Sequence, residues 1–178
     1  MAILKKKYFD VKLEIFDTLI PLLTYKPEDL EKRTIKFDLT KILRGKNCEA
    51  KFIVKKRNDK LIGELYEFKI SQSYIRRLIG HNISIVEDSF ACATKDKDTT
   101  IRIKPFIITR KRVHRSVRKA LRNGAREFIK KVVSSKTREE IFKEVISSTF
   151  QRQLSKKLKK IYPLAVCEIR IVKVEKLK

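Results

Sequence analysis

The chain has 178 residues, and its 45 Lys and Arg against 21 Asp and Glu give a formal net charge of +24 at pH 7. Apolar residues make up 42% of the chain, which is enough for a hydrophobic core and excludes a disordered basic tail. A folded protein with so much like charge repels itself unless a polyanion neutralises it. The basic residues run along the whole chain instead of forming one cluster, so nucleic acid is a better partner than a membrane surface.

The cysteines and the N-terminus indicate a cytoplasmic protein. Cys48, Cys92 and Cys167 are widely spaced and form no CxxC pair, which disfavours both a disulfide framework and a zinc site. We expect reduced, buried thiols. The chain begins without the apolar run of a signal peptide, and its apolar stretches are far shorter than the roughly 20 residues of a membrane span.

The N-terminal part alternates apolar and polar residues with a period of two, which is typical of strands with one buried face. This alternation predicts strands at residues 9–15 and 35–39. Between them, Pro21 and Pro27 are expected to interrupt the chain, and residues 27–30 resemble a single helical turn.

A hairpin and a short helix follow. Residues 48–55 and 61–70 are predicted strands, and the basic segment 56–60 between them is a predicted hairpin tip. That tip either lies in solvent or contacts phosphate. Residues 71–79 read as a helix that begins at a serine cap, Ser71 or Ser73, and stops at Gly80.

Three more strands are predicted at residues 83–87, 90–94 and 101–108. The polar segment 95–99 is the turn between the last two. Proline cannot donate a backbone hydrogen bond, so Lys104-Pro105 indicates either an edge strand or a bulge at that point.

At Arg110 the pattern changes to that of a basic amphipathic helix. Its predicted apolar face consists of Val113, Val117, Leu121, Phe128 and Val132. Basic residues surround this face, with only Glu127 opposing them, and several are like-charge pairs at i,i+4. Such pairs destabilise a helix by a few tenths of a kcal/mol each, so their accumulation favours a phosphate-binding surface over a solvated one.

The chain closes with two further helices and a strand. Thr137-Arg138-Glu139-Glu140 is a capping-box start for one helix, and residues 151–160 form the next, which Tyr162-Pro163 ends. Residues 166–176 alternate like a strand, but both faces are mixed, which suggests an edge or surface-crossing position.

Together these elements predict an α+β fold. A mostly antiparallel, barrel-like sheet is expected in a mainly β scaffold at residues 1–110. Residues 111–178 are expected to hold the basic helix, the other helices and a final strand that returns to the sheet, in one integrated domain. The elements do not alternate as βαβ units, which disfavours a doubly wound nucleotide-binding fold.

Motifs for catalysis, metals and cofactors are missing from the sequence. Its four glycines form neither GxGxxG nor a P-loop, and His81 and His114 lack the Cys or acidic neighbours of a zinc site. The nearest approach to a magnesium-binding carboxylate cluster consists of Glu87, Asp88, Asp96 and Asp98. Surface turns explain these acids better. We therefore expect no catalytic residue, no metal and no cofactor.

Several segments, in order along the chain, resemble the S-three-A-e family (eS-one) of archaeal and eukaryotic small-subunit ribosomal proteins. They are KYFDVK at 7–12, residues 33–41, YIRRL at 74–78, TKD at 94–96 with IRIKPF at 101–106, VRKAL at 117–121, and KIYPL at 160–164 with VCEIR at 166–170. Two positions depart from the family: its Thr-Ser-Gln before the basic helix is absent, and Lys97 replaces a turn glycine. The basic tails of many members are also missing, which suggests a compact version.

The resemblance implies a structural, non-enzymatic constituent of the small ribosomal subunit, bound on the platform near the messenger exit. Its implied partners are small-subunit rRNA, neighbouring platform proteins and nearby mRNA, in the cytoplasm. We expect RNA binding by Arg76, Arg77, Arg110, Lys111, Arg112, Arg115, Arg118, Lys119, Arg122 and Arg126. Two alternatives stay open: a free-standing nucleic-acid-binding protein, with equal affinity for DNA and RNA, and an RNA-processing enzyme, with metal-dependent turnover.

Overall fold

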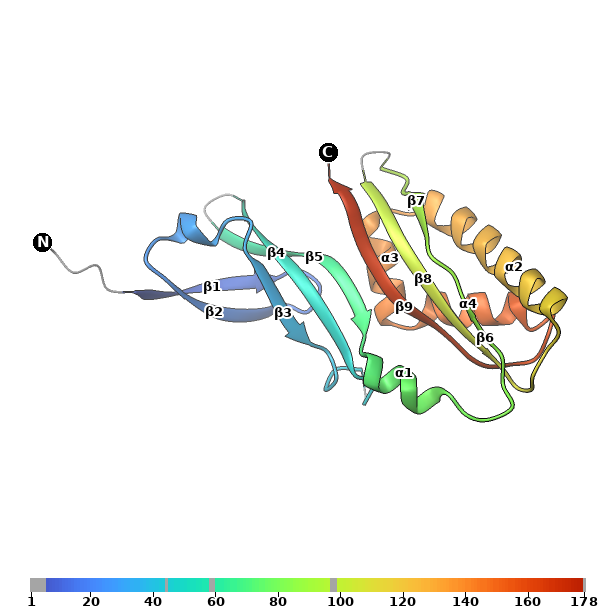
Figure 1. Cartoon of the computed structure of the whole chain (residues 1–178). Helices are drawn as coiled ribbons and strands as arrows, with labels where there is room; N and C mark the ends of the chain where they lie inside the picture. Colours follow the sequence, from blue (N-terminus) through green and yellow to red (C-terminus); the bar gives the residue numbers. More distant parts are fainter. Residues whose placement is uncertain (1–5, 44, 58–59, 97–98, 178) are drawn as a thin grey trace, which may run out of the picture.

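The computed structural model describes residues 6–43, 45–57, 60–96 and 99–177 (Figure 1). Within these residues strands and helices are largely segregated along the chain: most strands precede the three longer helices, and one strand follows them. In chain order they are β1 (Lys7–Leu13), β2 (Thr18–Thr24), the 3₁₀ turn η1 (Pro27–Leu30), β3 (Thr34–Asp38), β4 (Cys48–Arg57), β5 (Lys60–Ile70), α1 (Gln72–Leu78), β6 (Ile85–Glu87), β7 (Phe90–Ala93), β8 (Thr99–Thr109), α2 (Arg115–Ser134), α3 (Arg138–Ile146), α4 (Thr149–Leu158) and β9 (Leu164–Leu177).

The α+β fold predicted from the sequence is confirmed, but the barrel-like part is not. The strands follow the open order β2-β1-β5-β9-β8-β6, with β4 and then β3 on the other edge of β5, and β7 beside β8. The described strands therefore do not close into a barrel. One edge of β5 is shared, because β1 pairs at Ile62 and Gly63 and β9 pairs at residues 67–69.

This shared edge makes β5 the link between the N-terminal sheet and the C-terminal layer (Figure 1). All described pairings are antiparallel apart from the short β1–β5 pairing. The continuity of the sheet supports the proposal that residues 1–110 and 111–178 form one integrated domain.

The expectation that Pro21 breaks the chain was wrong. Pro21 lies inside β2, opposite Asp10 in a hairpin with β1. In the described structure β2 pairs with β1 alone, so one of its edges is free and the missing N–H of a proline is tolerated there. The predicted turn at residues 27–30 is confirmed as η1.

The final strand was also misplaced by the sequence interpretation. β9 is an interior strand, paired with β5 on one side and β8 on the other. Its register with β8 slips three times, and each slip leaves one extra residue on β9: Ala165, Arg170 and Glu175. These bulges reset the alternation, so Ile169 is buried and so is Val172, three positions later.

One of these slips lies opposite Lys104-Pro105, so the bulge predicted there is confirmed. On its other side β8 pairs with β6 as far as Phe106 and with β7 from Ile103, so the described pairings pass over Lys104 and Pro105 on that side. The other predicted strands and the helices predicted at residues 71–79 and 151–160 occur close to their predicted bounds, and α3 begins where the capping box at Thr137 predicts; β2 was not predicted. Ser71 caps α1, because its Oγ accepts from the backbone N of Tyr74 at 3.3 Å. Residues 58–59 of the predicted hairpin tip and residues 97–98 of the polar turn lie outside the described residues.

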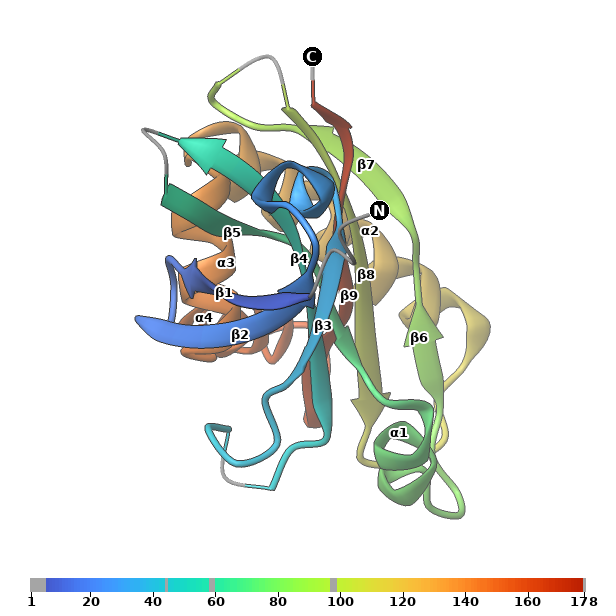
Figure 2. The same ribbon diagram turned by 90° about the vertical axis from the view of Figure 1, so that its left-hand side faces the viewer.

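Helices α2, α3 and α4 cover one face of the sheet formed by β8 and β9 (Figures 1 and 2). The deepest residues of α2 are Leu121, Ala125, Ile129 and Val133. Of the face predicted from sequence, only Leu121 is fully buried; Val117, Phe128 and Val132 are half-buried, and Val113 precedes the helix. The offset arises because α2 packs against both the β6–β7 edge and α4, which widens its apolar surface beyond one stripe.

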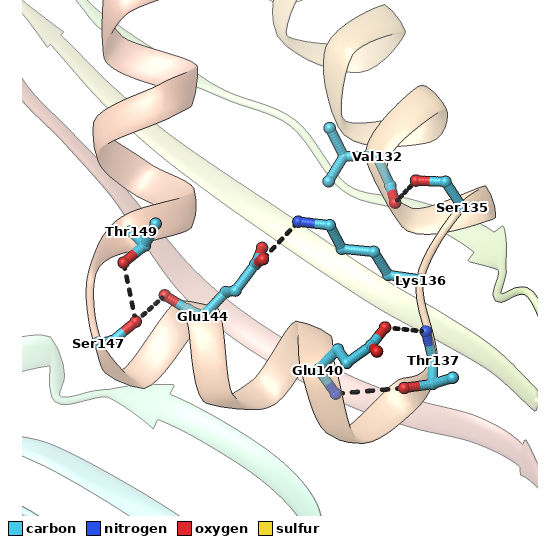
Figure 3. A network of polar contacts seen from close by, with 8 residues as sticks. All are labelled: Val132, Ser135, Lys136, Thr137, Glu140, Glu144, Ser147 and Thr149. Atoms are coloured by element: carbon cyan, nitrogen blue, oxygen red, sulfur yellow. Dashed lines mark hydrogen bonds and ion pairs between the residues drawn. The ribbon is translucent and has the colours of Figure 1, made fainter.

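Polar contacts fix the turn from α2 to α3 and the end of α3 (Figure 3). Ser135 Oγ donates to the carbonyl oxygen of Val132 at 2.9 Å, where α2 ends. The predicted capping box of α3 is confirmed: Thr137 N donates to Glu140 Oε2 at 2.9 Å, and Glu140 N donates to Thr137 Oγ1 at 3.4 Å. Lys136, in the turn before α3, forms an ion pair with Glu144, which lies one helical turn beyond Glu140. These contacts set the direction in which α3 leaves α2.

Candidate nucleic-acid interface

The outer flank of α2 carries a row of cations, which we call the α2 stripe: Arg115, Arg118, Lys119 and Arg122. All four side chains are exposed and line an open hollow of about 760 Å³ together with Ser116 and Asn123. In the described part of the chain, no acidic group lies within ion-pair distance of them. The helix interior is thus stabilised by packing, while its outer flank keeps its charge uncompensated.

The start of α2 adds to this positive field. Its first turn contains no acidic residue, although acids are favoured at a helix N-terminus. The cap is His114, whose Nδ1 accepts from the backbone N of Ser116 at 3.4 Å. Arg115 therefore lies in the first turn, at the positive end of the helix dipole, an arrangement that attracts anions.

Unlike the cations of the α2 stripe, Arg126 has an acidic partner among the described residues of the protein. Its Nε and Nη2 each donate to the carboxylate of Asp88 at 3.0 Å, in the turn between β6 and β7. Its guanidinium also lies 5.7 Å from the centre of the Phe90 ring. The charge of Arg126 is therefore already compensated within the protein, and the position of α2 over the β6–β7 turn is fixed by it.

Arg110, Lys111 and Arg112 form the exposed loop between β8 and α2. Backbone contacts hold this loop: Arg110 N donates to the carbonyl oxygen of Pro163 at 3.3 Å, and Thr109 Oγ1 donates to that of Lys111 at 2.7 Å. The loop leads directly into the α2 stripe, so these three residues extend the same cationic surface.

Arg76 and Arg77 belong to a different surface. Both are exposed on α1, which lies apart from α2 in both views (Figures 1 and 2). The guanidinium of Arg77 lies 5.6 Å from the centre of the Tyr74 ring. The ten predicted residues thus divide into one group on α1 and another on α2 with its preceding loop.

The sequence interpretation missed a further cationic surface on α4. Arg152, Lys156 and Lys159 are exposed, and all three line a second hollow that also contains Lys46. The available signal was their spacing of four and three residues in a helix without any acidic residue.

The acids considered as metal ligands serve other contacts. Glu87 Oε2 lies 3.0 Å from Nη1 of Arg170, and Asp88 holds Arg126. Asp96 is exposed, and Asp98 lies outside the described residues. Within the residues that the structure describes, no group of three or more His, Cys, Asp or Glu could hold a metal ion.

Two further predictions concern the thiols and the membrane. All three cysteines are free; Cys48 and Cys92 are buried and Cys167 is half-buried. Among the described helices, none is both long enough and apolar enough to cross a membrane.

Comparison with known proteins agrees with the family resemblance of the sequence motifs. The sequence model of the Ribosomal S3Ae family matches residues 2–178 of the chain. The chain is 33% identical over 124 residues to the small ribosomal subunit protein eS1 of Saccharolobus islandicus, an alignment that covers 70% of this chain and 59% of that relative. It is 28% identical over 181 residues to the eS1 protein of Nanoarchaeum equitans, covering 93% and 90%. The chain belongs to the Ribosomal S3Ae family.

Proposed function

We propose that this chain is a structural, non-enzymatic constituent of the small ribosomal subunit that binds rRNA through the α2 stripe. The observation that carries the proposal is the run of four exposed cations without acidic partners in the described structure. In a chain with a net charge of +24, neutralisation by a polyanion stabilises the fold. The names of the eS1 relatives indicate which particle supplies that polyanion.

The stripe suits recognition of the phosphate backbone. Arginine forks two hydrogen bonds onto phosphate, and three of the four stripe residues are arginines. His114 is the only residue with a ring among the described residues that line this hollow, and Phe, Tyr and Trp are absent from it, so the hollow offers little area for base stacking. Binding through α2 therefore depends on the shape and charge of folded RNA instead of its sequence.

The position within the subunit is part of the same proposal. Family membership supports a place on the platform near the messenger exit, beside other platform proteins, with mRNA passing nearby in the cytoplasm. The protein then acts as a positioned scaffold, and its β-rich half holds the basic helix in place.

Exchange of Arg115, Arg118 and Arg122 for Gln tests the proposal. Each lost phosphate contact lowers the slope of log K against log salt concentration by about 0.7 to 0.9, so the slope for small-subunit rRNA should fall by about 2 to 3 units. A matched control exchanges Lys26, Lys36 and Lys69, which are exposed on other elements, and removes the same charge. The control should keep most of the wild-type slope.

Sedimentation provides the second test. The protein should travel with small subunits in a sucrose gradient of a cell lysate and stay there at moderate salt. Recovery of the protein entirely in the free fraction would refute a ribosomal role. Equal affinity for duplex DNA and rRNA would favour a free-standing nucleic-acid-binding protein.

A further inference from the structure

A second hollow lies where the β-rich half meets the helical half. We call it the seam hollow; its volume is about 720 Å³, close to that of the hollow along α2. Its walls come from the loop between β3 and β4, from α1, from α4 and from β9. Its polar side chains include Lys46, Tyr74, Arg152, Ser155, Lys156 and Lys159. Segments distant in sequence thus combine to form one cationic recess.

The charge of this recess is uncompensated on the α4 side. α4 contains no acidic residue, and Arg152 and Lys156 form a like-charge pair at i,i+4, with Lys159 three positions further. In the part of the chain that the structure describes, none of these three cations has an acidic partner. Their mutual repulsion destabilises a helix of only ten residues unless an anion lies between them.

The acidic residue that lines this hollow, Glu168, already has a cationic partner. Glu168 of β9 pairs with Lys46 at 2.6 Å, so these two charges cancel. The three cations of α4 are left over, beside neutral hydroxyl groups of Ser155 and Tyr74 that can donate to an acceptor. Cations with adjacent hydroxyl donors are the groups that bind phosphate and sugar oxygens of nucleic acids.

The seam hollow and the α2 stripe lie on different sides of the α2–α4 pair. The flank of α2 that contacts α4 carries Gly124, where a Cβ atom would lie 3.4 Å from Leu158. It also carries Phe128, whose ring centre lies 5.5 Å from Lys157 Nζ. The flank with the α2 stripe instead leads to Arg126 and its partner Asp88. One short RNA segment therefore does not fill both hollows.

We infer that the seam hollow binds a second segment of rRNA backbone, separate from the segment at the α2 stripe. This inference rests on the proposed function and extends it. The bound phosphates neutralise Arg152, Lys156 and Lys159 and contact both halves of the protein. The RNA thereby fastens the loop after β3 and helix α1 to the helical layer.

Three triple variants test this inference with an in vitro transcript of small-subunit rRNA. Each exchanges three cations for Gln: Arg152, Lys156 and Lys159 in α4; Arg115, Arg118 and Arg122 in α2; and Lys26, Lys36 and Lys69 as the control. Binding is measured over a range of KCl concentrations, and hydroxyl-radical probing identifies the protected nucleotides. The α4 variant should lose about 2 to 3 units of salt slope and a set of protections that the α2 variant keeps.

The outcomes separate the two proposals. If the α4 variant keeps the wild-type slope and protections while the α2 variant loses its own, the seam hollow is not an RNA site and the proposed function stands. Loss of the same nucleotides in both variants would overturn the claim of two segments. Failure of the wild-type protein to bind the transcript would refute the proposed function itself. If the α4 triple variant unfolds, Lys159→Gln alone should still lower the slope by about 0.7 to 0.9.

Discussion

Arg138 in the first turn of α3 donates from Nη2 to Oε2 of Glu64 on β5 at 3.1 Å. Glu64 is 3% exposed, and its carboxylate also pairs with Lys55 at 2.9 Å and with Arg57 at 2.8 Å. One buried acid thus gathers three cations from β4 and α3. This contact joins the β-rich half to the helical half at a distance from the seam hollow.

Removal of the buried charge should destabilise the protein. Glu64→Gln leaves Arg138 and Lys55 without their counterion, and leaves Arg57 with Glu14 alone, at 3.6 Å. Loss of one partner of a buried pair costs about 3 kcal/mol. Urea denaturation measures the change in the free energy of unfolding. The exposed Glu49 of β4 provides the control, because Glu49→Gln should change that free energy by less than about 0.5 kcal/mol. Equal effects of the two variants would contradict the role of Glu64.

The same carboxylate predicts how stability depends on pH. Burial raises the pKa of Glu64, but the hydrogen bonds and charges of Lys55 and Arg138 outweigh it and hold the pKa below its ordinary value. A carboxyl group with a lowered pKa stabilises the fold above its unfolded pKa of about 4.3. That stabilisation is lost as the pH falls through the folded pKa. The stability difference between wild type and Glu64→Gln should therefore shrink below about pH 4.

Gly124 should respond differently to small and large side chains. Gly124→Ala removes a flexible residue from the interior of α2 and should stabilise the protein by about 0.5 kcal/mol. The new Cβ would lie 3.2 Å from Cδ1 of Ile161, which is 44% exposed and free to shift. Gly124→Leu should instead destabilise by about 2 kcal/mol, because the fully buried Leu158 cannot move away. Thermal melting distinguishes these signs, and destabilisation by both variants would show that Ile161 is fixed.

Asp88 should limit the affinity of the helix for RNA. Asp88→Asn releases Arg126 beside the α2 stripe, so the affinity for rRNA should rise and the salt slope should steepen by up to about one unit. Asp17→Asn is the matched control, since Asp17 pairs with Lys12 at 2.8 Å on the distant β1–β2 hairpin. An equal gain from both variants would mean that net charge alone governs binding.

The thiols should be unreactive in the folded protein. Burial raises the pKa of Cys48 and of Cys167 to about 12, and it also raises the pKa of Cys92. At pH 8 a thiol of pKa 12 is ionised to roughly 10⁻⁴, and the thiolate is the reactive form. Ellman's reagent should therefore react slowly before denaturation and rapidly with all three cysteines afterwards. Fast reaction of the native protein would indicate that the halves open.

Local patterns were sufficient for most of the helices and strands. The capping box at Thr137 and Glu140 marks the start of α3 because the partners are three residues apart. The alternation at residues 48–55 and 61–70 likewise identifies the hairpin of β4 and β5. Interactions of this range are encoded by neighbouring residues, so periodicity alone reveals them.

Long-range pairing was beyond the reach of such patterns. β9 has mixed faces because its bulges, at Arg170 among others, place successive parts of the strand in different registers against β8. Pro21 is accepted in β2 because of that strand's place at the end of the sheet order. Neither the register nor the order of strands is written in the local alternation.

The sequence by itself determined the sign and size of the charge, the family-like motifs and the basic helix from which RNA binding is proposed. Only the tertiary structure decided which cations have no acidic partner within the described part of the protein and so remain available to bind RNA. It neutralises Arg126 with Asp88, 38 positions away, and Lys46 with Glu168, 122 positions away. It also brings Lys46 and Tyr74 beside the cations of α4 to form the seam hollow. The physical reason is that charge compensation depends on distances of a few ångströms between groups far apart in the chain, which spacing along the sequence does not specify.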